Sequence, residues 1–170
     1  MTTLITEAAL QARVKEVARE IRRDAGDDAI LLLGVLKGAF MFMADLMRHI
    51  GGDVQCDFIA VSSYAGTEST GEVQIKKDVD SPLEGRRVII VEDIVDTGLT
   101  LDYLQGALRN RHPSSLKTAC LLSKPSRRQT AVPVDYVGFE IDDQFVVGYG
   151  LDFNEQYRNL PYIGLVEGVS

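Results

Sequence analysis

Residues 87–100 read RVIIVEDIVDTGLT, and this stretch joins a run of apolar residues to an acidic, glycine-containing turn. The apolar run Arg87–Val91 predicts a strand buried on both faces, as in a parallel sheet. Leucines at positions 101, 104 and 108 follow at helical spacing, so a helix is expected from about Gly98 to Asn110. A buried strand that leads through a turn into an amphipathic helix indicates an α/β fold.

The same alternation continues on both sides of this stretch. Amphipathic helices are expected at about 6–24 and 39–50, and strands at 29–35, 54–61, 116–122 and 134–141. Alternating residues at 73–77 predict a return strand exposed on one face. With no internal repeat and no linker, we expect a single domain over residues 1–170, built on an open, mostly parallel, twisted sheet flanked by helices. In such sheets ligands bind beyond the carboxyl ends of the strands.

The composition disfavours several classes of function. The formal net charge of −7 argues against a nucleic-acid partner, which would require a basic surface. No apolar run approaches the roughly 18 residues that span a bilayer. Residues 1–7 lack the pattern of a signal peptide, so we expect a cytoplasmic protein with no membrane partner. The two cysteines are unclustered and there are only two histidines, so a disulfide framework and a His-based zinc site are disfavoured.

The turn at the end of the Arg87–Val91 strand carries unusual chemistry. Glu92 and Asp93 are adjacent carboxylates, and Asp96 is a third. The small or hydroxyl-bearing residues that follow expose backbone N–H groups at a helix N-terminus, where they can cradle a phosphate. Carboxylates beside a phosphate repel it unless they serve a sugar hydroxyl, a proton or a metal. The pattern therefore predicts a phosphorylated sugar together with a divalent cation.

Other interpretations of this turn remain open at the level of sequence. Asp96 or Thr97 could simply cap the following helix, although capping does not explain two more carboxylates. The tripeptide Asp96-Thr97-Gly98 also matches the active-site motif of retroviral-type aspartic proteases, but those are all-β dimers, and here a leucine-striped helix follows. The dinucleotide-binding fingerprint and the Walker A pattern are absent from the sequence.

Residues 88–100 closely resemble the phosphoribosyl-pyrophosphate motif of the type I phosphoribosyltransferases. Other segments are similar to the hypoxanthine-guanine members of that family, and the similarity covers nearly the whole chain. The resemblance implies a small hood formed by the two terminal segments. It assigns Glu92 and Asp93 to ribose and Mg²⁺ binding, and Asp96 to acid–base catalysis at the purine N7. The 5-phosphate would bind the backbone of Asp96, Thr97, Gly98, Leu99 and Thr100.

Two further segments resemble loops of the family. Leu36, Lys37 and Gly38 match a loop that binds pyrophosphate and contains an unusual cis peptide bond before the lysine. Ser63 and Tyr64, with the polar residues up to Gly71, match a long flexible loop that closes over the reacting sugar. A polar, glycine-containing connection between two strands is the plainer interpretation of the second segment.

The C-terminal part of the chain resembles the family's purine pocket. The resemblance implies that Phe145 stacks on the base, Val146 offers backbone groups to its edge, and Lys124 donates to the 6-oxygen. Asp152 would hold Mg²⁺ through water, and Arg158 would contact pyrophosphate. The plainer alternatives are a solvated lysine and core aromatics, which are the commoner fates of these residue types. Gln144 departs from the pattern, because some members carry lysine there.

The implied enzyme transfers the 5-phosphoribosyl group from 5-phosphoribosyl 1-pyrophosphate to a 6-oxopurine, hypoxanthine and probably guanine, with Mg²⁺ as cofactor. The resemblance also implies a homodimer or homotetramer. A regulatory protein of the same fold is the other alternative. Such a protein usually needs a basic face or an added nucleic-acid-binding domain, which the acidic balance and the absence of an extension disfavour.

Overall fold

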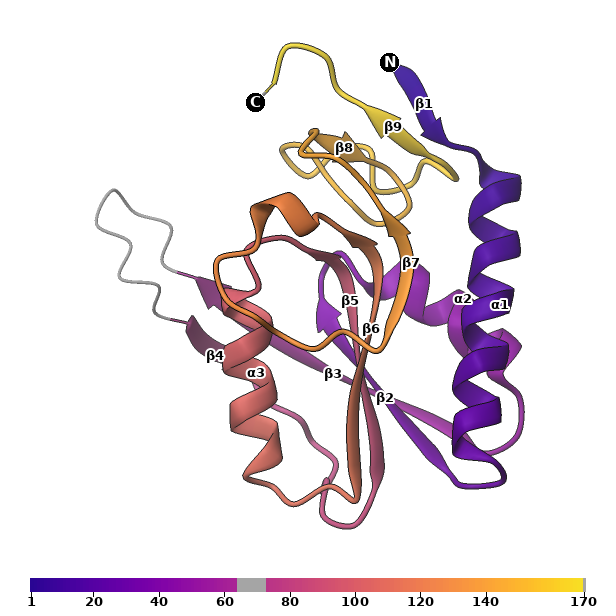
Figure 1. Ribbon diagram of the computed structural model, residues 1–170, viewed down its shortest axis with the longest axis vertical. Helices are drawn as coiled ribbons and strands as arrows, with labels where there is room; N and C mark the ends of the chain where they lie inside the picture. The colour runs from indigo at the N-terminus through magenta and orange to yellow at the C-terminus, as the bar shows by residue number, and fades with distance from the viewer. Residues whose placement is uncertain (64–72, 170) are drawn as a thin grey trace.

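A computed structural model describes residues 1–63 and 73–169 of the chain. Its centre is a six-stranded sheet in the order β4-β3-β2-β5-β6-β7 (Figure 1). All neighbouring pairs are parallel except β3 and β4, which are antiparallel. The strands are β2 (Ile30–Leu36), β3 (Val54–Ser63), β4 (Val73–Lys77), β5 (Arg87–Val95), β6 (Ser115–Ser123) and β7 (Tyr136–Glu140). The predicted mostly parallel α/β sheet is therefore confirmed.

Helices cover both faces of this sheet. Helix α1 (Glu7–Ala25) begins after Thr6, whose side chain accepts a hydrogen bond from the Ala9 N–H at 3.1 Å. It packs with α2 (Phe40–Ile50) on one face, and α3 (Leu99–Arg109) lies on the other. None of the helices in the described part of the chain is long and apolar enough to cross a membrane.

Two hydrophobic cores follow from the alternation of side chains along the central strands. In β5, Ile89 and Val91 belong to the core under α1 and α2, whereas Val88 and Ile90 belong to the core under α3. Every second residue therefore faces the opposite helix layer. This two-sided burial explains why β2 and β5 are almost continuously apolar in sequence.

A second, smaller sheet lies beyond the carboxyl ends of the parallel strands (Figure 1). Its order is β1-β9-β8, from β1 (Thr2–Ile5), β9 (Ile163–Leu165) and β8 (Val146–Val147). The N-terminal strand thus pairs with the last strand of the chain, as the predicted hood requires. The hood places the C-terminal segments above the sheet edge at which ligands are expected.

The predicted elements lie within two residues of their predicted bounds, except at the end of β5. Strand β5 continues to Val95, so Glu92 and Asp93 lie in the strand and not in the turn that follows. The strand extends because β6 beside it also extends, pairing Glu92 with Cys120 and Val95 with Ser123. Sequence periodicity alone cannot show such pairing, because the carboxylates interrupt the apolar run.

Candidate active site

The paired carboxylates sit at the carboxyl end of β5. Glu92 is only 8% exposed, and its Oε1 atom is buried without a hydrogen-bond partner in the structure. Burial, together with the charge of Asp93, raises the pKa of Glu92 well above its ordinary value. Burial also raises the pKa of Asp93; the carboxylate of Asp152 adds to this shift and the guanidinium of Arg158 opposes it. Among the described residues, no cation offsets the burial of Glu92, although buried charges are normally paired.

The loop between β2 and α2 lies directly against these carboxylates. A Cβ atom added to Gly38 would lie 1.7 Å from Asp93 Oδ2, so only glycine leaves room for the carboxylate as it stands. The peptide bond between Leu36 and Lys37 is cis, as the resemblance implies. Gly150 packs on the other side of the loop, because its own added Cβ would lie 2.3 Å from the Gly38 carbonyl oxygen.

The turn between β5 and α3 encloses a small cavity. Its lining includes Glu92 and Val95 of β5 and the turn residues Asp96, Thr97, Gly98 and Thr100. Gly98 has a φ of 86°, in the left-handed region that favours glycine. The Thr97 hydroxyl accepts a hydrogen bond from the Leu99 N–H at 3.3 Å. The segment predicted to hold the 5-phosphate therefore forms a concave turn at the start of a helix, where backbone N–H groups can bind an anion.

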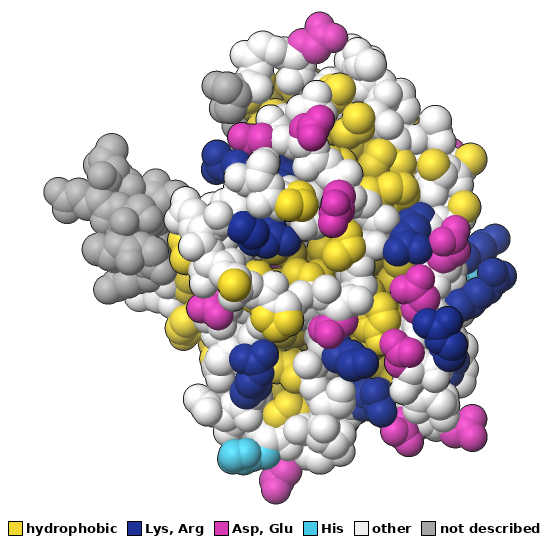
Figure 2. Space-filling view, in the orientation of Figure 1, with side chains coloured by type: hydrophobic (Ala, Val, Ile, Leu, Met, Phe, Trp, Pro, Cys, Tyr) yellow, Lys and Arg dark blue, Asp and Glu magenta, His cyan; other side chains and the backbone are white. Residues whose placement is uncertain are grey.

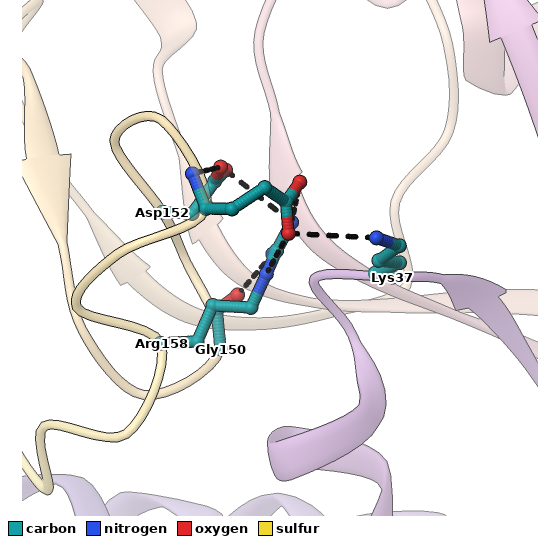
Figure 3. Close-up of polar contacts among 5 residues, drawn as sticks. Lys37, Gly150, Asp152 and Arg158 are labelled. Carbon is teal, nitrogen blue, oxygen red and sulfur yellow. Dashed lines mark hydrogen bonds and ion pairs between the residues drawn. The ribbon is translucent and has the colours of Figure 1, made fainter.

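Two cationic side chains, Lys37 and Arg158, contact the carboxylate of Glu155 near the carboxyl ends of the strands (Figure 3). Lys37 Nζ lies 3.4 Å from Glu155 Oε2, and Arg158 Nη2 lies 3.1 Å from Glu155 Oε1. Arg158 also donates to the Gly150 carbonyl at 2.6 Å and pairs with Asp152 at 3.5 Å. The two cationic residues among those predicted to contact pyrophosphate are therefore brought together, Lys37 from the loop after β2 and Arg158 from the C-terminal segment.

A second hollow opens next to Asp96. Lys124 and Phe145 line it together with Asp96, Arg127, Asp143, Gln144 and Val169. Lys124 is only 8% exposed, and its Nζ atom lies 3.6 Å from Asp143 Oδ1. A solvated loop lysine is therefore the wrong interpretation of this residue. Arg127 Nε donates to Asp96 Oδ1 at 2.9 Å, and Arg127 Nη1 lies 3.6 Å from Asp143 Oδ2.

The aromatic residues of the C-terminal segment divide between two environments. Phe145 is partly exposed in the hollow and meets Phe153 edge-to-face, with ring centroids 5.5 Å apart. Tyr149 is a buried core residue, and its hydroxyl bonds to Asp45 of α2. Val146 is buried in β8. The structure thus places Phe145, but not Tyr149, where it could contact a ligand in the hollow.

Several expectations find no preformed counterpart. Within residues 1–63 and 73–169, no group of three or more His, Cys, Asp or Glu side chains is arranged to hold a metal ion. The predicted lid falls largely outside the described residues: Tyr64 is not among them, and only the backbone of Ser63 is described, at the end of β3.

On the face drawn in Figure 2, Lys and Arg side chains are interspersed with Asp and Glu and form no broad basic patch.

Sequence reasoning missed three charged residues of this region, namely Glu155, Arg127 and Asp143. Each contacts a residue that was predicted: Glu155 contacts Lys37 and Arg158, Arg127 contacts Asp96, and Asp143 contacts Lys124. Only Glu155 lies close in sequence to a predicted residue that it contacts, three positions before Arg158, whereas Arg127 lies 31 positions from Asp96. Such charges are usually solvated, so proximity alone does not single them out.

Comparison with known proteins gives a consistent result. The family model of the phosphoribosyl transferase domain matches residues 2–154. The hypoxanthine-guanine phosphoribosyltransferase of Bacillus subtilis (strain 168) is 52% identical over 165 residues, covering 96% of this chain and 92% of that protein. The hypoxanthine phosphoribosyltransferase of Escherichia coli (strain K12) is 48% identical over 167 residues, covering 96% and 93%. A crystal structure of a hypoxanthine-guanine phosphoribosyltransferase from Bacillus anthracis matches with a TM-score of 0.94 at 50% identity, covering 98% of both chains.

Proposed function

The chain belongs to the phosphoribosyl transferase domain family, and we propose that it is a purine salvage enzyme. It transfers the 5-phosphoribosyl group from 5-phosphoribosyl 1-pyrophosphate to hypoxanthine, and to guanine, giving the nucleoside monophosphate and pyrophosphate. The observation that carries this proposal is the convergence of four groups at one sheet edge. These are the buried carboxylates of β5, the concave turn before α3, the Lys37 and Arg158 cations, and the hollow around Lys124.

The reaction needs few covalent steps from the protein. A purine ring nitrogen forms a bond to C1 of the ribose while the bond from C1 to the pyrophosphate oxygen breaks. Positive charge develops on the sugar and negative charge on the leaving group, so catalysis rests on positioning and electrostatics. In our assignment, Lys37 and Arg158 receive the pyrophosphate, and the backbone N–H groups of residues 96–100 hold the 5-phosphate. Asp96 takes or returns the proton at the purine N7.

Mg²⁺ is part of the proposal, and the chemistry of β5 fits it. Glu92 has a buried oxygen with no partner, and the adjacent Asp93 has a pKa raised by burial, so a cation or ribose hydroxyls would supply the missing interactions. A magnesium ion would neutralise the charge of the pyrophosphate leaving group. Glu92 and Asp93 would hold the ribose hydroxyls and the metal, with Asp152 contributing from the hood.

Base choice follows from Lys124. An ammonium group has three donors and no acceptor, so it can pair with the 6-oxygen of hypoxanthine or guanine but not with the amino group of adenine. Because Lys124 is buried, a mismatched base would leave one N–H donor of the ammonium group without an acceptor, which costs about 1–3 kcal/mol. We therefore propose a 6-oxopurine as the acceptor, with Phe145 stacking on it and Val146 providing backbone contacts.

The test is a Mg²⁺-dependent assay of purine conversion, with hypoxanthine, guanine and adenine compared. The Lys124→Met variant is expected to lose hypoxanthine use and to shrink the ratio of kcat/KM between hypoxanthine and adenine by about tenfold, the ratio that 1.4 kcal/mol produces. Lys15→Met, on the exposed side of α1, is the matched control and should leave the ratio unchanged. An unaltered ratio in Lys124→Met would mean that the base lies elsewhere, and no Mg²⁺-dependent conversion would reject the function itself.

The resemblance also leads us to propose a homodimer or homotetramer, and sedimentation of the purified protein measures this oligomeric state directly. The composition and sequence pattern are the basis for proposing one catalytic domain per chain, a cytoplasmic location, and no nucleic-acid or membrane partner.

A further inference from the structure

Two consecutive arginines hold Asp96 in different ways. Arg128 Nη1 donates to the carbonyl oxygens of Val95 at 2.9 Å and Asp96 at 2.8 Å, so it fixes the backbone. Arg127 Nε donates to the Asp96 carboxylate at 2.9 Å, so it fixes the side chain. Resting on the function proposed above, we propose that Arg127 is a positioning residue that orients the Asp96 carboxylate for proton transfer with the purine.

Arg127 is held in place by the segment that carries it. The Lys124 N–H donates to the Val95 carbonyl at 3.0 Å, and the Gln129 N–H donates to the Thr97 carbonyl at 2.9 Å. Gly98 leaves no space between the two segments, because an added Cβ would lie 3.2 Å from the Thr130 carbonyl oxygen. Residues 124–130 therefore run along the turn that contains Asp96, tied to it on both sides of Arg127. A side chain anchored in this way can orient its partner reproducibly.

The contact also leaves Asp96 able to react. Arg127 Nε bonds to one carboxylate oxygen, Oδ1, and no described residue donates a hydrogen bond to the other, Oδ2, which we assign to the purine proton. On its far side Arg127 faces Asp143, whose other oxygen lies 3.6 Å from Lys124 Nζ. The row Lys124, Asp143, Arg127, Asp96 alternates in charge across the hollow. The two acidic neighbours raise the pKa of Arg127, so the guanidinium keeps its charge.

A double-mutant cycle tests whether Arg127 acts through Asp96. In otherwise wild-type protein, Arg127→Gln is expected to lower the single-turnover rate constant with hypoxanthine, and kcat where chemistry limits it, by about three- to tenfold. The reason is that the Asp96 carboxylate loses its fixed orientation. The KM for the sugar diphosphate should stay within about twofold, since Arg127 is not placed on that substrate. In an Asp96→Asn background, the same change is expected to alter kcat by less than about twofold. An equal loss in both backgrounds would overturn the proposal.

A matched control separates positioning from general stability. Arg111 pairs with Asp78 at 2.7 Å in a similar partly exposed ion pair, at the end of α3 remote from the turn. Arg111→Gln should leave kcat within about twofold of wild type, as surface ion pairs contribute little. Thermal unfolding of both variants is measured alongside. If the wild type is active and the Arg127→Gln variant is equally active, only the positioning role of Arg127 is rejected. If the wild type itself is inactive, the proposed function is rejected.

Discussion

Glu155 places a carboxylate between the two cations that we assign to pyrophosphate. Its side chain bonds to Lys37 and Arg158, and Arg158 holds the pKa of Glu155 below its ordinary value (Figure 3). Both Glu155 and Lys37 are largely exposed, so these ion pairs are weak and a multiply charged ligand can displace the carboxylate. We therefore predict that Glu155 competes with pyrophosphate for the same cations.

Glu155→Gln is expected to strengthen product inhibition. Without the competing carboxylate, the inhibition constant of pyrophosphate should fall by about two- to fivefold, because surface charge pairs have small effects. Initial rates with added pyrophosphate measure this constant. Glu16→Gln is the control, because Glu16 forms an equivalent exposed pair with Arg13 three residues away on α1. A weaker inhibition by pyrophosphate in Glu155→Gln would instead mean that Glu155 holds the cations in position for it.

Individual residues were predictable from the sequence to different degrees. The carboxylates of β5 were recognisable, because charged residues rarely follow a buried strand without a role. Glu155 was not recognisable, because its orientation depends on a turn in which Asn154, Glu155 and Tyr157 all have positive φ angles. Such a conformation is uncommon for non-glycine residues and is set by the surrounding structure.

At the scale of elements, three segments that are distant in sequence stack on one another through glycines. Gly150 of the hood packs on the Gly38 carbonyl, and Gly38 packs on the Asp93 carboxylate of β5. Strand and helix locations were predictable from apolar periodicity, since the two cores alternate along β2 and β5. Contacts between loops were not predictable in this way, because they depend on where the strand ends lie in space.

Gly38→Ala is expected to lower kcat/KM by at least about tenfold without unfolding the protein. The new methyl group would collide with the Asp93 carboxylate, which can move away because it is the end of a side chain. The displaced carboxylate would then be misplaced for the ribose and metal, and small displacements of reacting groups are costly. Activity and thermal unfolding are measured on the same preparation.

Gly106→Ala provides the control for this glycine change. Gly106 lies within α3, and an added Cβ would meet nothing within 4 Å. Replacing it should leave activity unchanged and stabilise the protein by about 0.5–1 kcal/mol, the usual preference for alanine over glycine inside a helix. If Gly38→Ala retained full activity, the Asp93 position would not matter for the reaction.

At the scale of the whole molecule, the buried carboxylates oppose folding. Glu92 is buried near the carboxyl end of β5 with an unpartnered oxygen, and burial raises its pKa well above the ordinary value of 4.5. A carboxyl with a raised pKa binds more protons in the folded state than in the unfolded one. The free energy of unfolding therefore falls as the pH rises above about 4.5. Proteins tolerate such groups at sites where a ligand supplies the missing interaction.

Glu92→Gln is therefore expected to stabilise the ligand-free protein while impairing the reaction. A neutral amide is less costly to bury than a carboxylate. The unfolding temperature at pH 8 should rise by about 2–4 °C, the shift that roughly 1 kcal/mol produces in a chain of this size. At pH values below 4.5, where the carboxyl is protonated in both states, the difference should vanish. Addition of Mg²⁺ with 5-phosphoribosyl 1-pyrophosphate should stabilise the wild type more than the variant, because the variant lacks one of the two β5 carboxylates that we assign to these ligands. Melting curves at both pH values, with and without these ligands, measure the unfolding temperatures.

Two outcomes would show that the Glu92 charge is already satisfied within the fold. One is a variant that is less stable than the wild type at pH 8, and the other is a variant whose unfolding temperature rises as much as that of the wild type when the ligands are added.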